Sequence, residues 1–561
     1  MRICIGTEPS GIADYRDKRH VAQRTFFYFR RITMRGNAFS KRRSTTRAFT
    51  RSRTWRSLLS YSSCFCLIVL ICSPRALAGN LWDETWIEAR SPHFVIVSAL
   101  SEARTVELVK DLENFRTAAA SFSEIGDFHE RIQTRTFVFP YASIDFSFVG
   151  QKAGYFVPGT RTNFAAVIAT EQRPDESLKH EYSHYLLHSR DQTAFPTWLD
   201  EGFAQVVSSL SVKDTKVELG DILPWQGNLL GWGDWMAFGQ ILESRGTVGL
   251  TPFHRSQFYA QSWLLVHYLM LGRPNADFST QLRSYLHAVE SGVVAQPAFE
   301  QAFGMAVTDL RKTLRQYMRS VGFRTRALQH PYPASQVTVR AMPRDQIAAA
   351  LGDLAFRVGR YETAQRCYDA ATNANANNAN AHAGTGNLLQ HAKKLDQAEQ
   401  RFQKALALEP NSALHELDYA ELLLARARAA KGTPRAHADL EEARKRLARS
   451  NQLDANIPET LEMIGLTFLE PGEHGELALA PLLLAYQMLP SNFEIRLALT
   501  GSYAASHQLD KARSTLNALT SWAEIDDVAA VERTLIELDR RTTTPFSDAL
   551  HEAQSAVPNS R

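Results

Sequence analysis

Cysteine is scarce in this chain, and its distribution is uneven. The sequence holds five cysteines, and those at positions 4, 64, 66 and 72 precede residue 79. Only Cys367 lies beyond that point. A segment with a single cysteine forms no intrachain disulfide and offers no cluster of thiolate metal ligands. Disulfide-stabilised folds and cysteine-zinc folds are therefore excluded for residues 79–561.

Acidic residues are scarce at the N-terminus. Residues 1–57 contain 15 Lys/Arg and only 3 Asp/Glu. The apolar run at 57–73 is too short for a comfortable membrane span, and Ala76-Leu77-Ala78 has the small-x-small pattern of a cleavage site. We predict a basic leader and signal peptide over 1–78, with Met34 as an alternative start. The protein would then be exported, periplasmic or secreted; an uncleaved signal anchor at 57–73 is the other reading.

Removing this leader reverses the net charge. It takes away 16 of the 63 Lys/Arg and 3 of the 59 Asp/Glu, which leaves 47 basic and 56 acidic residues and a net charge of −9. The formal charge of +4 for the whole chain therefore belongs to the leader. It gives no argument for nucleic-acid binding.

The most informative motif is H-E-x-x-H, formed by His180, Glu181 and His184. Residues four apart lie on one helix face, so the two imidazoles can bind one metal ion. Glu181 lies about 100° round the helix from His180. Its carboxylate is thus aimed at the open position of the metal, where it can act as general base on a zinc-activated water. Apolar residues at Leu178, Tyr182, Tyr185 and Leu186 support the helix.

Glu201 is our prediction for the third metal ligand. It lies 17 residues after His184, in the first turn of a second helix predicted after Pro196. Asp191 and Asp200 are alternatives, and Asp200 could instead accept the N–H of a liganding histidine and so fix its tautomer. His188 is expected at the rim of the site or beside a ligand. The metzincin pattern is excluded, because Leu187 and Arg190 occupy the positions of its glycine and its third ligand.

These residues resemble a known family. H-E-x-x-H followed by W-L-x-E-G-x-A looks like the gluzincin "peptidase MA-like" domains, and 257–269 is similar to that family's Y-x-Q-S-W helix. The resemblance covers roughly residues 80–330. It implies an α+β thermolysin-like zincin fold, one zinc ion per chain and peptide hydrolysis. The spacing from His184 to Glu201 is slightly shorter than in the best-known gluzincins, which implies a tighter loop.

Peptide hydrolysis also needs a group that stabilises the oxyanion. Gluzincins use a Tyr or His from a later helix, and the resemblance points to Tyr259 as this catalytic group. Equally, Tyr259 could belong to a core-facing stripe with Trp263 and Val266. His254 and His267 are weaker alternatives for the role.

Two short apolar runs, 135–139 and 164–169, are bounded by turn residues and predict strands. In a thermolysin-like lobe, a strand at the edge of the cleft pairs with the substrate backbone. We take Asn163–Ala169 as a candidate for that edge. An ordinary buried strand is the alternative.

The C-terminal part is repetitive. Gly352, Ala364, Tyr368 and Ala371 recur 34 residues later as Gly386, Ala398, Phe402 and Ala405, which is the tetratricopeptide (TPR) period. Weaker units follow over about 412–450, 465–490 and 497–519. We predict an all-α TPR solenoid over 345–541, after a metallopeptidase-like domain at 79–330 and a linker at 331–344, and before a polar tail at 542–561.

The sequence supports two functions. The first is an exported zinc metallopeptidase that cleaves a peptide or protein substrate, with a protein partner or substrate bound in the TPR groove. The alternative is a non-catalytic TPR interaction or scaffold protein with a structural peptidase-like lobe. The solenoid could also pack against the lobe as a scaffold. No nucleic acid is expected as a partner, and a membrane only if the signal segment stays uncleaved.

Overall fold

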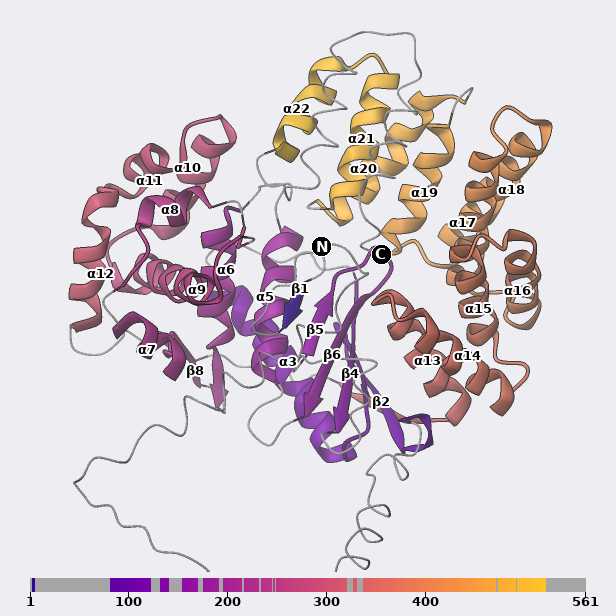
Figure 1. Cartoon of the computed structure of the whole chain (residues 1–561), viewed down its shortest axis with the longest axis horizontal. Helices are drawn as coiled ribbons and strands as arrows, with labels where there is room; N and C mark the ends of the chain where they lie inside the picture. The colour runs from indigo at the N-terminus through magenta and orange to yellow at the C-terminus, as the bar shows by residue number, and fades with distance from the viewer. Residues whose placement is uncertain are drawn as a thin grey trace, which may run out of the picture. The chain divides into compact units, whose positions relative to one another are not determined.

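A mixed β-sheet buried on both faces forms the centre of the lobe in this computed structural model (Figure 1). The structure describes residues 3–5, 81–122, 132–140, 154–169, 175–190, 195–213, 216–231, 234–244, 246–247, 249–319, 326–329, 336–470, 473–490 and 492–520. Apart from residues 3–5, the predicted leader lies outside these ranges, as does the predicted tail at 542–561. None of the helices in the described ranges is both long and apolar enough to cross a bilayer.

The sheet has seven strands in the order β1-β5-β6-β4-β3-β2-β10. β3, β4 and β6 pair in parallel. Each of the outer strands pairs antiparallel with its neighbours in the sheet. Their bounds are β1 (Ile3–Ile5), β2 (Trp86–Arg90), β3 (Phe94–Ser98), β4 (Thr134–Pro140), β5 (Gly154–Val157), β6 (Asn163–Ala169) and β10 (Thr338–Met342). The two strands predicted at 135–139 and 164–169 are confirmed.

Two of these strands correct expectations. β6 pairs with β4 on one side and β5 on the other, so the candidate edge strand Asn163–Ala169 is instead an interior strand. β10 falls inside the segment expected to be a linker, 331–344, and pairs with β2. The chain therefore adds a strand to the lobe's sheet just before the solenoid begins.

One face of the sheet carries helices α3 (Glu102–Phe122) and α5 (Asp175–Arg190). Phe94, Val138 and Phe156 point to this face and share a core with Tyr182 and Tyr185 of α5. A parallel sheet is stable only when both faces are covered, because its strands are apolar on both sides. α5 is thus a structural necessity as well as the helix that carries the H-E-x-x-H motif.

The opposite face is covered by the first helices of the solenoid. Phe137 and Phe139 of β4, which alternate with Val138, share a core with Ile347 and Leu351 of α13 (Arg344–Arg357). Ala364, Cys367 and Tyr368 of α14 (Tyr361–Ala374) belong to the same core. The lobe and the solenoid therefore share buried apolar surface.

The remainder of the lobe is mainly helical, with a small sheet. The three-stranded sheet consists of β7 (Ser211–Lys213), β8 (Lys216–Leu219) and β9 (Arg326–Gln329). The helices are α6 (Thr197–Ser208), α7 (Pro224–Gly231), α8 (Phe238–Glu243), α9 (Pro252–His267), α10 (Phe278–Glu290), α11 (Ala295–Phe303) and α12 (Leu310–Arg319). A π turn at Tyr268–Gly272 extends α9, and short 3-10 turns occur at Leu81–Asp83 and Val307–Asp309.

The predicted TPR repeats form successive helix pairs (Figure 1). After α13 and α14 come α15 (Ala379–His391), α16 (Leu395–Leu408), α17 (Ala413–Ala429), α18 (Pro434–Leu453), α19 (Pro458–Phe468), α20 (Leu479–Met488), α21 (Phe493–Ala505) and α22 (Leu509–Thr520), with a 3-10 turn at Gly475–Ala478. A Cβ on Gly352 would lie 2.5 Å from the Tyr368 ring, and one on Gly386 would lie 2.6 Å from the Phe402 ring. The 34-residue period thus repeats one contact, in which a glycine admits an aromatic ring.

Gly202 sets the crossing of α6 and α9. A Cβ at this position would lie 2.5 Å from the carbonyl oxygen of Ser262 and 2.6 Å from Cγ2 of Val266. Gly202→Ala should therefore force the helices apart and lower the free energy of unfolding by on the order of 2 kcal/mol. Urea unfolding measures this. Gly227→Ala in α7 is the control, since its Cβ meets Ile222 at an ordinary 3.5 Å; equal effects of both variants would contradict the prediction.

Candidate metal centre

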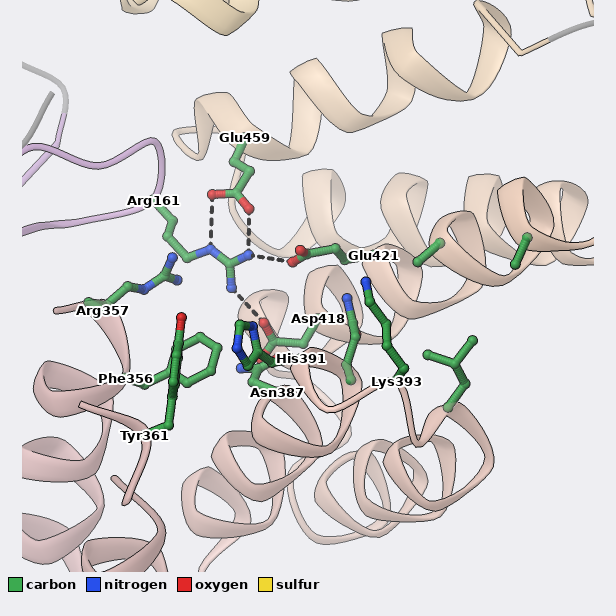
Figure 2. Close-up of a pocket in the computed structure, with 14 residues that line it drawn as sticks. Arg161, Phe356, Arg357, Tyr361, Asn387, His391, Lys393, Asp418, Glu421 and Glu459 are labelled. Atoms are coloured by element: carbon green, nitrogen blue, oxygen red, sulfur yellow. Dashed lines mark hydrogen bonds and ion pairs between the residues drawn. The ribbon is translucent and has the colours of Figure 1, made fainter. Parts of the chain in front are cut away.

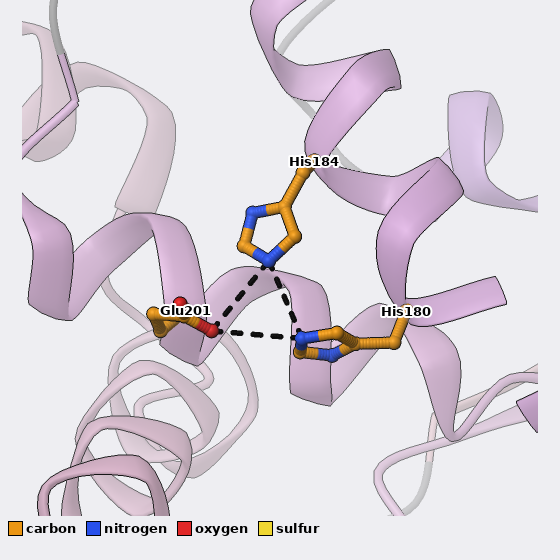
Figure 3. A group of neighbouring side chains, drawn as sticks. All are labelled: His180, His184 and Glu201. Carbon is orange, nitrogen blue, oxygen red and sulfur yellow. Dashed lines mark hydrogen bonds and ion pairs between the residues drawn. The ribbon is translucent and has the colours of Figure 1, made fainter. Parts of the chain in front are cut away.

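Helices α5 and α6 bring together the three predicted metal ligands. Nε2 of His180 lies 3.3 Å from Nε2 of His184, and each of these atoms lies 3.5 Å from Oε2 of Glu201. The two histidines project from one face of α5, and the carboxylate meets them from α6 (Figure 3). α6 begins at Thr197, directly after Pro196, as the sequence predicted. Glu201 therefore reaches the histidines within the first two turns of its helix.

The triangle of donor atoms has the size that zinc requires. Zinc binds imidazole nitrogen and carboxylate oxygen at about 2.0–2.2 Å, so two donors at tetrahedral angles are about 3.3–3.5 Å apart. Neutral imidazoles and a carboxylate are also ligands that suit this ion. His184 keeps 2% of its side-chain surface exposed, whereas His180 and Glu201 keep 23% and 19%. The residues therefore fit zinc, with access from the side of His180 and Glu201.

Glu181 lies next to this triangle without joining it. Its side chain is buried, and its Oε2 atom has no hydrogen-bond partner among the described residues. Burial raises the pKa of this carboxyl to about 7, with smaller opposing effects from His180 and His184. Buried polar atoms are almost always paired, and exceptions concentrate at functional sites. Glu181 thus has the placement and the proton affinity of a general base.

Asp200 supports the site from beside His184. Its Oδ1 lies 2.7 Å from Nδ1 of His184, and its Oδ2 lies 3.1 Å from Nε2 of His188. Despite its burial, the charges of His184 and His188 hold the pKa of Asp200 well below its usual value. Asp200 therefore accepts the Nδ1–H of His184 and leaves Nε2 facing the other donors. This was the alternative role considered for Asp200, and it explains the position of His188.

Opposite charges also fix the ionisation of the ligands. Burial alone would raise the pKa of Glu201, but His184 and His180 lower it to about 2. Burial disfavours the charged form of His184, yet Asp200 and Glu201 hold its pKa well above the usual value. Asp200 and Glu201 are thus negative and favour positive charge at His184, which a proton carries in the metal-free protein and a metal ion would carry in its place.

The charge of Glu201 acts on Tyr259 of α9. Burial, followed by the charge of Glu201, raises the pKa of the Tyr259 hydroxyl well above its usual value. Its neighbours Trp263 and Val266 are fully buried, whereas Tyr259 itself is half-buried. Tyr259 therefore belongs to the edge of the core stripe and keeps its hydroxyl protonated.

The other predicted alternatives have structural roles or fall outside the description. His267 is buried, with Nε2 3.0 Å from the carbonyl of Gly220 and Nδ1 2.9 Å from the hydroxyl of Tyr317. His254 is exposed and lies against Thr251, the N-cap of α9. Neither histidine belongs to the groups of clustered metal-binding side chains in the described ranges. Asp191 lies outside the described residues.

No protein-family model matches the sequence, and no curated protein matches it. Among solved structures, a thermophilic TPR protein of Thermus thermophilus is 22% identical, with a TM-score of 0.29 over 37% of this chain and 99% of that chain. PilF of Pseudomonas aeruginosa is 16% identical, with a TM-score of 0.30 over 38% of this chain and 92% of that one.

The Cut9–Hcn1 structure of the APC/C is 13% identical, with a TM-score of 0.30 over 69% of this chain and 65% of that chain. These scores are low. The chain's own helix pairs, and the repeated contacts of Gly352 with Tyr368 and of Gly386 with Phe402, show the TPR-like solenoid. An all-α TPR-type solenoid, a fold used for protein interaction, is what the C-terminal part of this chain forms.

Asp200→Asn should weaken metal binding without removing a ligand. The amide cannot hold the Nδ1–H of His184 as firmly, and loss of such a partner typically costs 10–100-fold in affinity, so we expect about that factor for zinc. Competition with a chromophoric chelator measures it. Asp277→Asn, which alters an exposed helix cap of α10, is the matched control and should leave the affinity unchanged. An unaltered affinity in Asp200→Asn would contradict the role assigned to Asp200.

Glu181→Gln should change how the stability of the metal-free protein depends on pH. The folded protein holds the Glu181 proton up to about pH 7, whereas the usual value is 4.5. Wild-type stability should therefore fall as pH rises from 4.5 to 7, by up to about 3 kcal/mol from this group. Glutamine lacks this titration. Urea unfolding in chelator at pH 5 and pH 8 should show the variant gaining on the wild type at pH 8; a constant difference would contradict the shifted pKa.

Proposed function

We propose that this protein is a zinc-dependent peptidase with a TPR solenoid that binds a protein partner or substrate. The proposal rests on a zinc-sized triangle, His180, His184 and Glu201, next to the buried carboxylate of Glu181, whose Oε2 has no hydrogen-bond partner among the described residues. A purely structural metal site has no need of such a carboxylate, since structural zinc sites are closed by four protein ligands. The resemblance to gluzincin domains supports the same reading.

The residues have distinct roles in this proposal. Zinc, when bound, would supply Lewis-acid chemistry, polarising a peptide carbonyl and lowering the pKa of water. Glu181 would take the proton from the attacking water at its unpaired Oε2 and pass it to the leaving amine. Its raised pKa suits it to hold that proton in transit. Tyr259, kept protonated, would donate its hydroxyl to the developing oxyanion.

A second function has its own support. The solenoid covers one face of the lobe's sheet, so it is an integral part of the fold, and its helix pairs form an interaction fold whether or not the metal site is active. In this reading the protein is a non-catalytic interaction or scaffold protein, and the lobe presents the solenoid. In either case we propose export, from the basic leader and the Ala76-Leu77-Ala78 pattern.

Zinc content and hydrolysis distinguish these functions. We expect about one zinc per chain in the wild type and loss of zinc in His184→Ala and Glu201→Gln, because each removes one of three ligands. His254→Ala, which removes an exposed histidine from the same lobe, is the matched control and should keep the metal. Elemental analysis after dialysis against a weak chelator makes the measurement. A folded wild type without zinc would leave only the interaction function.

Glu181→Gln tests the chemistry separately from metal binding. The variant should keep its zinc and lose hydrolysis of a fluorogenic casein by at least about 100-fold, the usual contribution of a general base. Activity that survives in Glu181→Gln, or that does not depend on zinc, would reject Glu181 as the base.

A further inference from the structure

The turn between β5 and β6 inserts an arginine among carboxylates of the solenoid. Arg161 lies at the tip of this turn, and its guanidinium contacts Asp418 and Glu421 of α17 and Glu459 of α19 (Figure 2). More than 250 positions separate the arginine from these acids in the sequence. The contact is therefore a tertiary one, made by the lobe with the first helices of two successive solenoid pairs.

The geometry is that of a specific arginine site. Nε and Nη2 of Arg161 lie 3.0 and 2.5 Å from the two oxygens of Glu459, a bidentate pairing. Nη1 lies 2.5 Å from Asp418, and Nη2 also lies 3.2 Å from Glu421. Three carboxylates thus contact the planar cation of Arg161, and the guanidinium of Arg357 lies beside it (Figure 2). A lysine ammonium could not match this fork of donors.

The backbone of the turn is recognised together with the side chain. The N–H of Glu459 donates to the carbonyl of Thr160 at 3.2 Å, and the hydroxyl of Thr160 donates to the Glu459 carboxylate. Glu459 lies in the first turn of α19, where backbone N–H groups lack partners within the helix. The solenoid therefore binds both a main-chain carbonyl and the arginine next to it, as a peptide receptor does.

Burial makes this site depend on its occupant. The side chains of Arg161, Asp418 and Glu459 keep only 9%, 7% and 3% of their surface exposed. Although burial disfavours the charged form, the charges of Glu459 and Asp418 hold the pKa of Arg161 well above its usual value. Buried carboxylates that lose their cation are strongly destabilised. The site therefore favours having an arginine in place, whatever chain supplies it.

A cavity of about 470 Å³ adjoins the arginine and opens along the solenoid (Figure 2). Its size is that of a small-ligand or peptide side-chain pocket. Tyr361 stacks on His391 with ring centroids 4.0 Å apart. The buried amide oxygen of Gln390 has no hydrogen-bond partner among the described residues. The residues that line the cavity thus include an aromatic surface and an amide oxygen, together with the cations Arg357 and Lys393.

We propose that Asp418, Glu421 and Glu459 form an arginine-recognition site of the solenoid, that the lobe's own turn fills it with Arg161, and that an arginine-bearing extended peptide competes for it through the adjoining cavity. This deepens the interaction half of the proposed function and does not depend on zinc. The lobe acts as a built-in ligand that a partner must displace.

Displacement of Arg161 would affect α5, the helix that carries two of the candidate metal ligands. The turn joins β5 to β6, and Phe156 of β5 packs against Tyr185 of α5 with ring centroids 5.9 Å apart. α5 also carries His180 and His184. A partner that releases Arg161 would therefore free the turn at one end of β5, a strand that packs on the helix carrying these two candidate metal ligands.

The test uses a labelled synthetic peptide that copies residues 156–164, with a second peptide in which Gln replaces the arginine as control. Binding is measured by fluorescence anisotropy on the full chain in a Glu181→Gln background, so that hydrolysis cannot consume the peptide. Arg161→Ala removes the guanidinium that Asp418, Glu421 and Glu459 contact. We expect this variant to bind the arginine peptide at least tenfold more tightly than the chain that keeps Arg161.

Two controls decide the outcome. The tighter binding by Arg161→Ala should disappear when the glutamine peptide replaces the arginine peptide. It should also disappear when Glu459→Gln is added to Arg161→Ala. The affinity should fall as salt is raised, because charge pairing carries it. Equal binding to Arg161→Ala and to the Glu459→Gln double variant, or equal binding of both peptides, would overturn the proposal.

A second measurement covers the case in which Arg161→Ala folds poorly. N-ethylguanidinium at millimolar concentration should raise the melting temperature of Arg161→Ala and leave the wild type and the double variant unchanged, because it restores the missing cation. Arg161→Lys keeps a cation in the site but lacks the fork of donors, so it should bind the arginine peptide more tightly than the chain that keeps Arg161. Absence of this binding, together with absence of the rescue by N-ethylguanidinium, would also overturn the proposal. Zinc content is read in the same samples, so failure of the arginine site is distinguished from failure of the metal site.

Discussion

The central sheet must be covered on both faces, and the rest of the structure depends on that constraint. Its parallel strands alternate apolar residues to both sides, so Val138 faces α5 while Phe137 and Phe139 face α13 of the solenoid. Neither helical layer is optional, because uncovering either face would expose apolar strand surface to water. The candidate metal centre and the repeats are therefore coupled through one sheet.

The chemistry of the candidate metal centre follows from this packing. Apolar residues of α5 rest on the sheet, and the same helix holds Glu181 in a buried position between its two histidines. Burial is what raises the pKa of Glu181, whereas Asp200 keeps its charge because two imidazoles contact it. The surroundings thus shift the pKa of Glu181 and the pKa of Asp200 in opposite directions, a pattern typical of catalytic sites.

Among the described residues, the solenoid is attached to the lobe by contacts of two physical kinds. The shared apolar core around α13 and α14 is extensive and non-directional, so it fixes the first repeat in place. The contact of Arg161 with α17 and α19 is polar and directional, and depends on a few hydrogen bonds. The second kind can be exchanged for an equivalent ligand, while the first cannot. This difference is why we propose exchange at Arg161 and not at the apolar core.

The sequence alone determined the local features. Helix periodicity placed His180 and His184 on one face, Pro196 set the start of the second helix, and the 34-residue period identified the repeated pairs of glycine and aromatic ring, because each depends on neighbours along the chain. Tertiary structure decided the rest. Asn163–Ala169 became an interior strand and part of the expected linker became β10, since strand order is set by distant partners. The choice of Asp200 as the partner of His184, and the meeting of Arg161 with Glu459, likewise required the folded chain, because long-range pairs leave no periodic signal in the sequence.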